Sequence, residues 1–309
     1  MLEFVRRFEG QPYSASPSWL PDSTAPMFAA IEQAFEHLEN DRQSLTKDEQ
    51  READYLQVTL LGNAIIRHPQ RTTQEDVEHL QNVAKSFIQP SQSFSASEFR
   101  VAQVILSILE GTRRFSMETE FANWLQEELR GKADSTQAQA FATMLAAVVT
   151  RLNLLEKPIA FTSQTLGNEP FNLADLRGKV VLIEFWSASC QPCLRDFPAI
   201  KRIYSQYHDQ GFEVVGVCLN ASPSEVERNV DEFGLPWIQL YDDWQFESRG
   251  NGRLAAQFGV QGLPTTLLVN RAGNVAVLGA RPLTNDSQTD LESLVKQLLI
   301  QPANNQVEW

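Results

Sequence analysis

Two cysteines separated by two residues are the part of this sequence best suited to chemistry. Cys190 and Cys193 enclose Gln191 and Pro192, shortly after the apolar run Val180–Trp186. Such a run before an amphipathic segment is typical of a buried strand that leads into a helix. At a helix N-terminus, unpaired N–H groups and the helix dipole favour a thiolate. The pair therefore predicts dithiol–disulfide exchange, with Cys190 as the nucleophile and Cys193 as the resolving thiol.

The same spacing also supplies half of a zinc site, so the rest of the chain decides between metal and redox chemistry. A closed structural zinc site takes about four ligands. The third cysteine, Cys218, falls in an apolar run typical of a buried strand, and the 4 histidines are scattered along the chain. We therefore expect no metal and no cofactor beyond the cysteine pair, and we interpret Cys218 as a packing residue.

The cysteine pair is expected within alternating strands and helices. Strand-like runs occur at residues 180–186, 212–219, 237–240, 265–270 and 275–278, and helical segments lie near 191–208, 223–233, 252–257 and 288–300. Alternation at this spacing predicts an α/β sheet. Turn residues at 271–274 separate the last two strands, so we expect that pair to be antiparallel. A short strand at 159–162 and a turn at Gly167 and Asn168 are expected at the start of this part.

The first half of the sequence has the apolar spacing of helices from about residue 23 to residue 155. We expect about six helices, beginning near residues 24, 47, 73, 97, 117 and 136. Hydroxyl residues followed by carboxylates indicate capping at three of these starts: Thr46 with Glu49, Thr73 with Asp76 and Ser95 with Glu98. A helical bundle is the simplest interpretation, and a helical-hairpin array is the alternative. The change of pattern near residue 156 predicts an all-helical domain at 1–156 and an α/β domain at 157–309.

Composition narrows the range of partners. The 309-residue chain has 26 Lys and Arg against 39 Asp and Glu, a formal charge of −13, which disfavours nucleic acid as the main partner. Its apolar runs are far shorter than the ~20 residues of a membrane-spanning helix. Charged residues such as Arg6, Arg7 and Glu9 interrupt the start of the chain. We therefore expect no membrane span and no export signal in the sequence as given.

The residues around the cysteine pair resemble those of a known family. Trp186, the two cysteines, Pro198 and the later stretch Gly262–Thr265 resemble the thioredoxin superfamily. The acidic residue and proline that follow the second cysteine are similar to its TlpA/ResA branch of thiol-disulfide oxidoreductases. The resemblance covers about residues 157–300 and implies an α/β thioredoxin-like fold behind the helical domain. It also implies protein dithiol or disulfide substrates, an upstream electron donor or acceptor, and a compartment outside the cytoplasm. Without an export signal, a cytoplasmic location stays open.

The resemblance gives roles to two carboxylates. Glu184 stands where thioredoxins carry a buried acidic residue that moves protons to and from the resolving cysteine. Its apolar neighbours are expected to desolvate it and raise its pKa toward neutral, which suits general acid/base chemistry. The alternative is a position on the polar side of the strand. Asp196 matches the acidic residue that tunes the cysteines in the TlpA/ResA branch, and an ordinary surface position on the helix is equally open.

The resemblance also implies a substrate-binding surface. Pro264 matches a cis-proline loop that faces the redox pair and contacts substrate backbone, and Leu263 precedes it. Gln191, Pro192 and Trp186 are expected to complete this surface from the side of the cysteines.

Other features leave the specificity and the function open. Ser189 stands where relatives usually carry Trp, and Gln191 replaces the residues more often found between the cysteines, so substrate preference and redox potential are not fixed. The polar and aromatic segment Tyr241–Gly252 is expected on the substrate side, with an ordinary solvent loop as the alternative. A different function is a binding or scaffold protein whose helical domain recruits an unidentified partner, with a non-catalytic thioredoxin-like domain.

Overall fold

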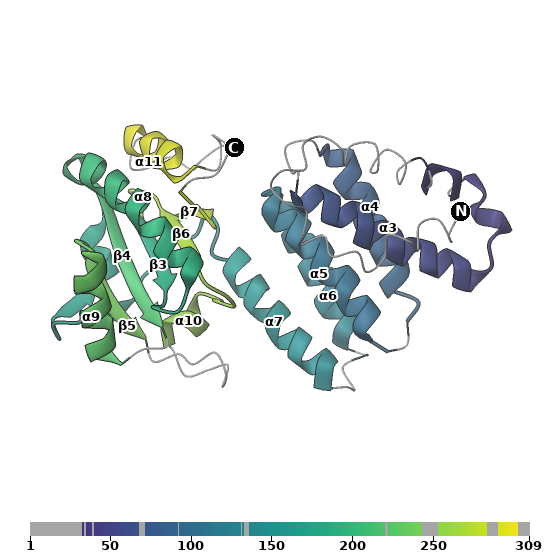
Figure 1. The fold of residues 1–309 in the computed structure, drawn as a ribbon, viewed down its shortest axis with the longest axis horizontal. Helices are drawn as coiled ribbons and strands as arrows, with labels where there is room; N and C mark the ends of the chain where they lie inside the picture. The colour runs from purple at the N-terminus through teal and green to yellow at the C-terminus, as the bar shows by residue number, and fades with distance from the viewer. Residues whose placement is uncertain are drawn as a thin grey trace. The chain divides into compact units, whose positions relative to one another are not determined.

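The computed structural model describes residues 33, 35–38, 40–67, 72–91, 93–130, 132, 136–219, 222–242, 253–282 and 290–301. The chain divides into two compact units, residues 1–145 and 146–309. The first is helical and the second is built on a mixed sheet (Figure 1), which is the fold class expected. The division falls inside helix α7 (Thr136–Leu152), earlier than the boundary expected after residue 156.

The helices of the first unit begin near the residues that the sequence indicates. They are α3 (Lys47–Arg67), α4 (Gln74–Ile88), α5 (Ala96–Gly111), α6 (Phe115–Arg130) and the start of α7. Thr73 and Ser95 form capping boxes with Asp76 and Glu98. Thr46 and Glu49 exchange the equivalent hydrogen bonds, so the three predicted caps are confirmed. Each box pairs backbone N–H groups that a helix start leaves without an intrahelical acceptor. The helix expected to begin near residue 24 starts outside the described residues.

Arg51 of α3 ties three helices of the first unit together. Its guanidinium donates to the Phe87 carbonyl at 2.6 Å, to Ser91 Oγ at 2.8 Å and to the buried carboxylate of Glu98. Burial by itself raises the pKa of Glu98, but hydrogen bonds from Ser95 and Ser91 outweigh burial and hold that pKa below its usual value. A charged carboxylate paired in this way fixes the spacing of α3, α4 and α5.

The described residues of the second unit form a five-stranded sheet in the order β5-β4-β3-β6-β7. The strands are β3 (Val180–Trp186), β4 (Phe212–Leu219), β5 (Ile238–Asp242), β6 (Thr265–Val269) and β7 (Val275–Leu278). β3, β4 and β5 are parallel, whereas β6 runs antiparallel to β3, and β7 to β6. The predicted antiparallel final pair is therefore confirmed. A separate hairpin of β1 (Thr162–Gln164) and β2 (Pro170–Asn172) precedes the sheet, and β1 begins later than the strand expected at 159–162.

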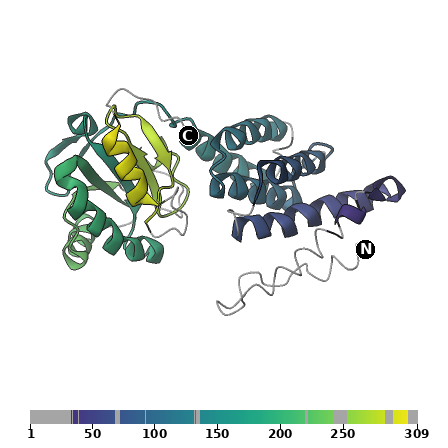
Figure 2. The same ribbon diagram turned by 90° about the horizontal axis from the view of Figure 1, so that it is seen from above.

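Helices cover both faces of this sheet. They are α8 (Gln191–Tyr207), α9 (Pro223–Phe233), α10 (Arg253–Gln257) and α11 (Leu291–Ile300). The ribbon views show helices on the two sides of the sheet (Figures 1 and 2). Val180, Leu182 and Trp186 of β3 pack in one hydrophobic cluster with residues of α8 and α11. Phe185 points to the opposite face and packs against Phe258, which follows α10. Side chains of a strand alternate between faces, so even-numbered residues of β3 face α8.

Gly259 allows the last turns of α7 to pack against the segment between α10 and β6. Its φ is +63°, and a Cβ at this position would lie 2.2 Å from the Ala147 carbonyl oxygen of α7. Only glycine combines a left-handed backbone with so close an approach. This contact explains why the end of α7 belongs to the second unit.

Candidate redox site

The Cys190–Cys193 disulfide lies where β3 ends and α8 begins. The two sulfur atoms are 2.00 Å apart. Cys190 is the N-cap of α8, and its Sγ accepts the Cys193 N–H at 3.2 Å. Pro192 in the first turn loses no hydrogen bond, because N–H groups there have no intrahelical acceptor. The predicted placement of the pair at a helix N-terminus is confirmed.

The two cysteines differ in their access to a partner. Cys190 exposes 9 % of its surface and Cys193 exposes 0 %. Both belong to the hydrophobic cluster between α8 and the sheet. An incoming sulfur atom therefore meets Cys190 first, and Cys193 lies behind it.

The loop before β6 lies at the same end of the sheet as the disulfide. Thr265, the first residue of β6, pairs with Phe185 near the end of β3. The Leu263–Pro264 peptide bond is cis, as the resemblance implies, and Leu263 packs against the cluster that contains both cysteines. Both loop residues are half-buried, so part of each side chain is accessible. On the α8 side, Gln191 is exposed and Pro192 is half-buried.

Trp186 requires a correction. Its side chain is 0 % exposed, so the expectation that it contacts substrate is wrong. The indole packs edge to face against Phe197 of α8, with ring centroids 5.2 Å apart. Its N–H donates to Gln239 Oε1 at 3.1 Å. Trp186 supports the disulfide from within the core, because an even-numbered position of β3 points under α8 rather than outward.

Glu184 is a buried acid on the same face of β3. It is 1 % exposed, and neither carboxylate oxygen has a hydrogen-bond partner among the described residues. Burial raises the pKa of Glu184 to about 8, with the charge of Asp196 adding to the rise and that of Arg281 opposing it. The expected burial is confirmed, and the alternative on a polar side of the strand is wrong. A carboxyl group of this kind exchanges its proton near neutral pH.

Asp196 is also buried, and it has a partner that the sequence did not reveal. Arg281, just after β7, places Nη2 2.7 Å from Asp196 Oδ2. Burial raises the pKa of Asp196, while the charge and the hydrogen bond of Arg281 oppose that rise. The surface alternative for Asp196 is wrong, since it is 6 % exposed. Arg281 belongs to no motif, and only the fold brings it to α8.

Cys218 is a packing residue, as predicted. It is a free, buried cysteine of β4. Burial, with a smaller contribution from the charge of Glu225, raises its pKa to about 12, so its thiol stays protonated and is a poor nucleophile. Within the described ranges, no three or more His, Cys, Asp or Glu side chains converge as a metal site would require. None of the described helices is long and apolar enough to span a bilayer.

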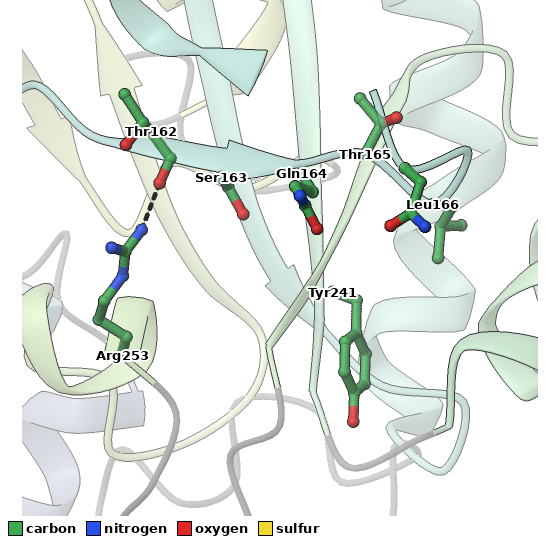
Figure 3. A pocket seen from close by; sticks show the side chains of 8 residues that line it. Thr162, Ser163, Gln164, Thr165, Leu166, Tyr241 and Arg253 are labelled. Carbon is green, nitrogen blue, oxygen red and sulfur yellow. Dashed lines mark hydrogen bonds between the residues drawn. The ribbon is translucent and has the colours of Figure 1, made fainter. Parts of the chain in front are cut away.

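A polar pocket of about 440 Å³ lies beside the β1–β2 hairpin (Figure 3). The hairpin residues from Thr162 onward form one wall, and Tyr241 of β5 and Arg253 of α10 form others. Arg253 donates to the Thr162 carbonyl and so holds the hairpin to α10. The segment expected on the substrate side contributes Tyr241 to this pocket, and its residues 243–252 lie outside the described residues.

Comparison with known proteins identifies the family. Residues 155–298 match the Redoxin family model. The thiol-disulfide oxidoreductase ResA of Halalkalibacterium halodurans is 30% identical over 141 residues, which cover 46% of this chain and 76% of that protein. The chain belongs to the ResA-like thiol-disulfide oxidoreductases. The thiol:disulfide interchange protein HelX of Rhodobacter capsulatus is 34% identical over 142 residues, 45% of this chain and 74% of that protein.

A solved thioredoxin domain of a Bacteroides vulgatus thiol-disulfide oxidoreductase covers 47% of this ResA-like chain and 97% of its own, with 23% identity and a TM-score of 0.40. The sequence relatives ResA and HelX place the chain in a family of enzymes, and they do not support a non-catalytic scaffold. The match begins at residue 155, and the helices α3 to α6 therefore lie outside it.

Proposed function

We propose that this ResA-like enzyme exchanges disulfides with protein targets through Cys190 and Cys193. The unequal access of the two bonded cysteines carries the proposal. Cys190 caps α8 with 9 % of its surface exposed, whereas Cys193 is 0 % exposed. A target can therefore reach the sulfur atom of Cys190, while that of Cys193 completes the exchange.

In the reducing direction, the Cys190 thiolate attacks one sulfur of a target disulfide and expels the other as a thiolate. The Cys193 thiolate then attacks Cys190 Sγ, breaks the mixed disulfide and releases the second target thiolate. Two electrons pass from the cysteine pair to the target, and the Cys190–Cys193 bond is the product. With an oxidising partner the steps run in reverse, and the difference between the two reduction potentials sets the direction.

Cys193 must lose a proton before it attacks, and Glu184 is the proposed acceptor. Burial raises the pKa of Glu184 to about 8, which makes its carboxylate a stronger base than that of an ordinary glutamate. A carboxyl group with a pKa in this range balances proton uptake against release near neutral pH, so it serves both directions of exchange. Asp196 and Arg281 tune this balance, because Asp196 raises the pKa of Glu184 and Arg281 lowers it.

The accessible groups near Cys190 are suited to a protein main chain. Gln191 and Pro192 on α8 and Leu263 and Pro264 before β6 are uncharged and at least partly accessible. Recognition through these residues depends on apolar contacts and hydrogen bonds rather than on the charge of the target. An upstream electron donor or acceptor protein is expected to use the same surface, because Cys190 is the more accessible sulfur of the pair.

A redox titration tests the proposal. The purified protein is equilibrated in glutathione or dithiothreitol buffers, and Trp fluorescence and thiol alkylation are followed. We expect one two-electron transition that Cys193→Ser abolishes and that Cys218→Ser leaves in place, because Cys218 is buried away from the pair. Absence of a transition in the unmodified protein, or its survival in Cys193→Ser, contradicts the proposal. Reduction of a disulfide-bonded test protein such as insulin then measures exchange with a protein target.

A further inference from the structure

A buried glutamine lies beside the buried acid of the redox site. Gly216 of β4 is the register partner of Glu184 on β3, and Gln239 of β5 is the register partner of Gly216. Residues paired in this way point to the same face of a sheet, and neighbouring strands lie about 4.8 Å apart. Glu184 and Gln239 therefore share the α8 face, with only a glycine between them.

Gly216 leaves room for the Gln239 side chain to lie across it. A Cβ on Gly216 would be 2.3 Å from Gln239 Oε1 and 2.8 Å from its Nε2, so the amide fills the place of the missing side chain. The amide reaches toward β3, where Oε1 accepts the Trp186 indole N–H at 3.1 Å. An indole N–H can only donate, which turns the amide oxygen toward Trp186 and the NH2 group away from it.

This arrangement leaves a buried donor and a buried acceptor on the same face of the sheet, both without partners among the described residues. Gln239 Nε2 and both carboxylate oxygens of Glu184 lack a hydrogen-bond partner among the described residues. The two residues are 5 % and 1 % exposed. Buried polar groups without partners destabilise a fold, and a small side-chain rotation or one ordered water satisfies such a pair.

We propose that Gln239 is a positioning residue for the proton step of disulfide exchange. Held by Trp186 and seated over Gly216, its amide presents N–H donors to the Glu184 carboxylate and stabilises the ionised form. The inference rests on the proposed function, in which Glu184 takes the proton of Cys193. A neutral donor makes ionisation easier without adding a charge to the core.

Charged, titratable and polar groups on α8, β4 and β6 and after β7 also surround Glu184. Asp196 of α8 and Arg281 after β7 act on it with opposite signs. Cys193 of α8 titrates when the disulfide is reduced, and Cys218 of β4 keeps its proton. On β6 the register partner of Glu184 is Thr266, whose hydroxyl donates to the Ala280 carbonyl. Among these groups Gln239 is the neutral donor that has no other acceptor among the described residues.

The test measures the ionisation of Glu184 in the oxidised protein, where neither Cys190 nor Cys193 titrates. Carbon-13 NMR of labelled glutamate side chains follows the carboxyl resonances against pH, and Glu184→Gln identifies the signal. Gln239→Met removes the donor at similar volume. Gly216→Ala keeps the glutamine but displaces its amide. We expect both variants to raise the Glu184 midpoint by about one pH unit, the size expected when a charged group loses a hydrogen bond.

Leu240→Met is the matched control, because it changes a buried side chain on the same strand but on the opposite face. It is expected to leave the Glu184 midpoint where it is in the unmodified protein. An unchanged midpoint in folded Gln239→Met or Gly216→Ala, or an equal shift in Leu240→Met, overturns the inference. Failure of the proposed function is seen separately, as the absence of the two-electron transition in the unmodified protein.

Discussion

At the scale of single residues, Glu184 links the redox site to the stability of the fold. Burial raises its pKa from 4.5 to about 8, so the folded state keeps a proton that the unfolded state releases between these values. The stabilising contribution is complete below pH 4.5 and is lost as pH rises to about 8. We expect Glu184→Gln to flatten this decline, since an amide has no proton to lose.

Urea unfolding of the oxidised protein at about pH 5 and about pH 9 measures this effect. The unmodified protein should lose more stability between the two conditions than Glu184→Gln. Glu169→Gln, at an exposed turn, is the control and should lose as much unfolding free energy between the two pH values as the unmodified protein. An equal loss in all three proteins means that Glu184 is ionised when folded.

Substitution of Arg281 should shift the pH dependence of disulfide exchange in a direction that can be predicted. Its guanidinium lies 2.7 Å from the Asp196 carboxylate and lowers the pKa of both Asp196 and Glu184. Arg281→Gln should therefore move the pH dependence of disulfide exchange to higher pH, because Glu184 then keeps its proton longer. Insulin reduction across the pH range measures the profile. Arg202→Gln removes a different pair, with Glu292, and should leave the profile in place; a common shift in both variants contradicts the role of Arg281.

At the scale of elements, the sequence predicts what depends on local pattern. β3, β4 and β7 occupy the predicted residues, because each is a mainly apolar run between turn residues. β5 extends to Asp242, beyond the predicted end, since Tyr241 and Asp242 are polar yet pair with β4. The Cys190–Cys193 pair could also be predicted from a local feature, because two residues separate its cysteines.

The sequence does not reveal which residues become neighbours across adjacent strands and helices. The neighbours of Glu184 are set by strand register, which brings Gln239 across Gly216. Arg281 reaches Asp196 only through the order of β6 and β7 and the packing of α8. The burial of Trp186 likewise depends on which face of β3 carries α8. No local pattern marks these positions, because each partner is distant in the chain and ordinary in type.

The packing of α7 on Gly259 gives a prediction for an element. Gly259→Ala places a Cβ 2.2 Å from the Ala147 carbonyl oxygen and strains a φ of +63°. We expect a loss of about 2 to 4 kcal/mol in unfolding free energy. Gly279→Ala is matched in conformation, with φ +67° and nothing within 4 Å of the added Cβ, and should cost about 1 kcal/mol. Urea unfolding compares the two, and equal losses show that the contact with α7 adds nothing.

At the scale of the whole molecule, every contact described for the redox site joins residues within the second unit. The disulfide, Glu184, the Asp196–Arg281 pair and the Leu263–Pro264 loop all lie between residues 146 and 309. A fragment of residues 136–309 keeps all of α7 and with it the Gly259 contact. We expect this fragment to have the same reduction potential as the full chain, because the potential depends on the surroundings of the two sulfur atoms.

Glutathione titration of the fragment and of the full chain compares the two potentials, and thermal unfolding confirms that the fragment is folded. Insulin reduction by the same samples separates potential from target use. Equal potentials with slower exchange by the fragment assign the helices α3 to α6 to target or partner recruitment. A shifted potential in a folded fragment contradicts the prediction and shows that the helical unit acts on the cysteine pair itself. If the fragment and the full chain have equal potentials and reduce insulin at equal rates, the second unit carries the whole reaction. The helical unit then has a role apart from the exchange chemistry.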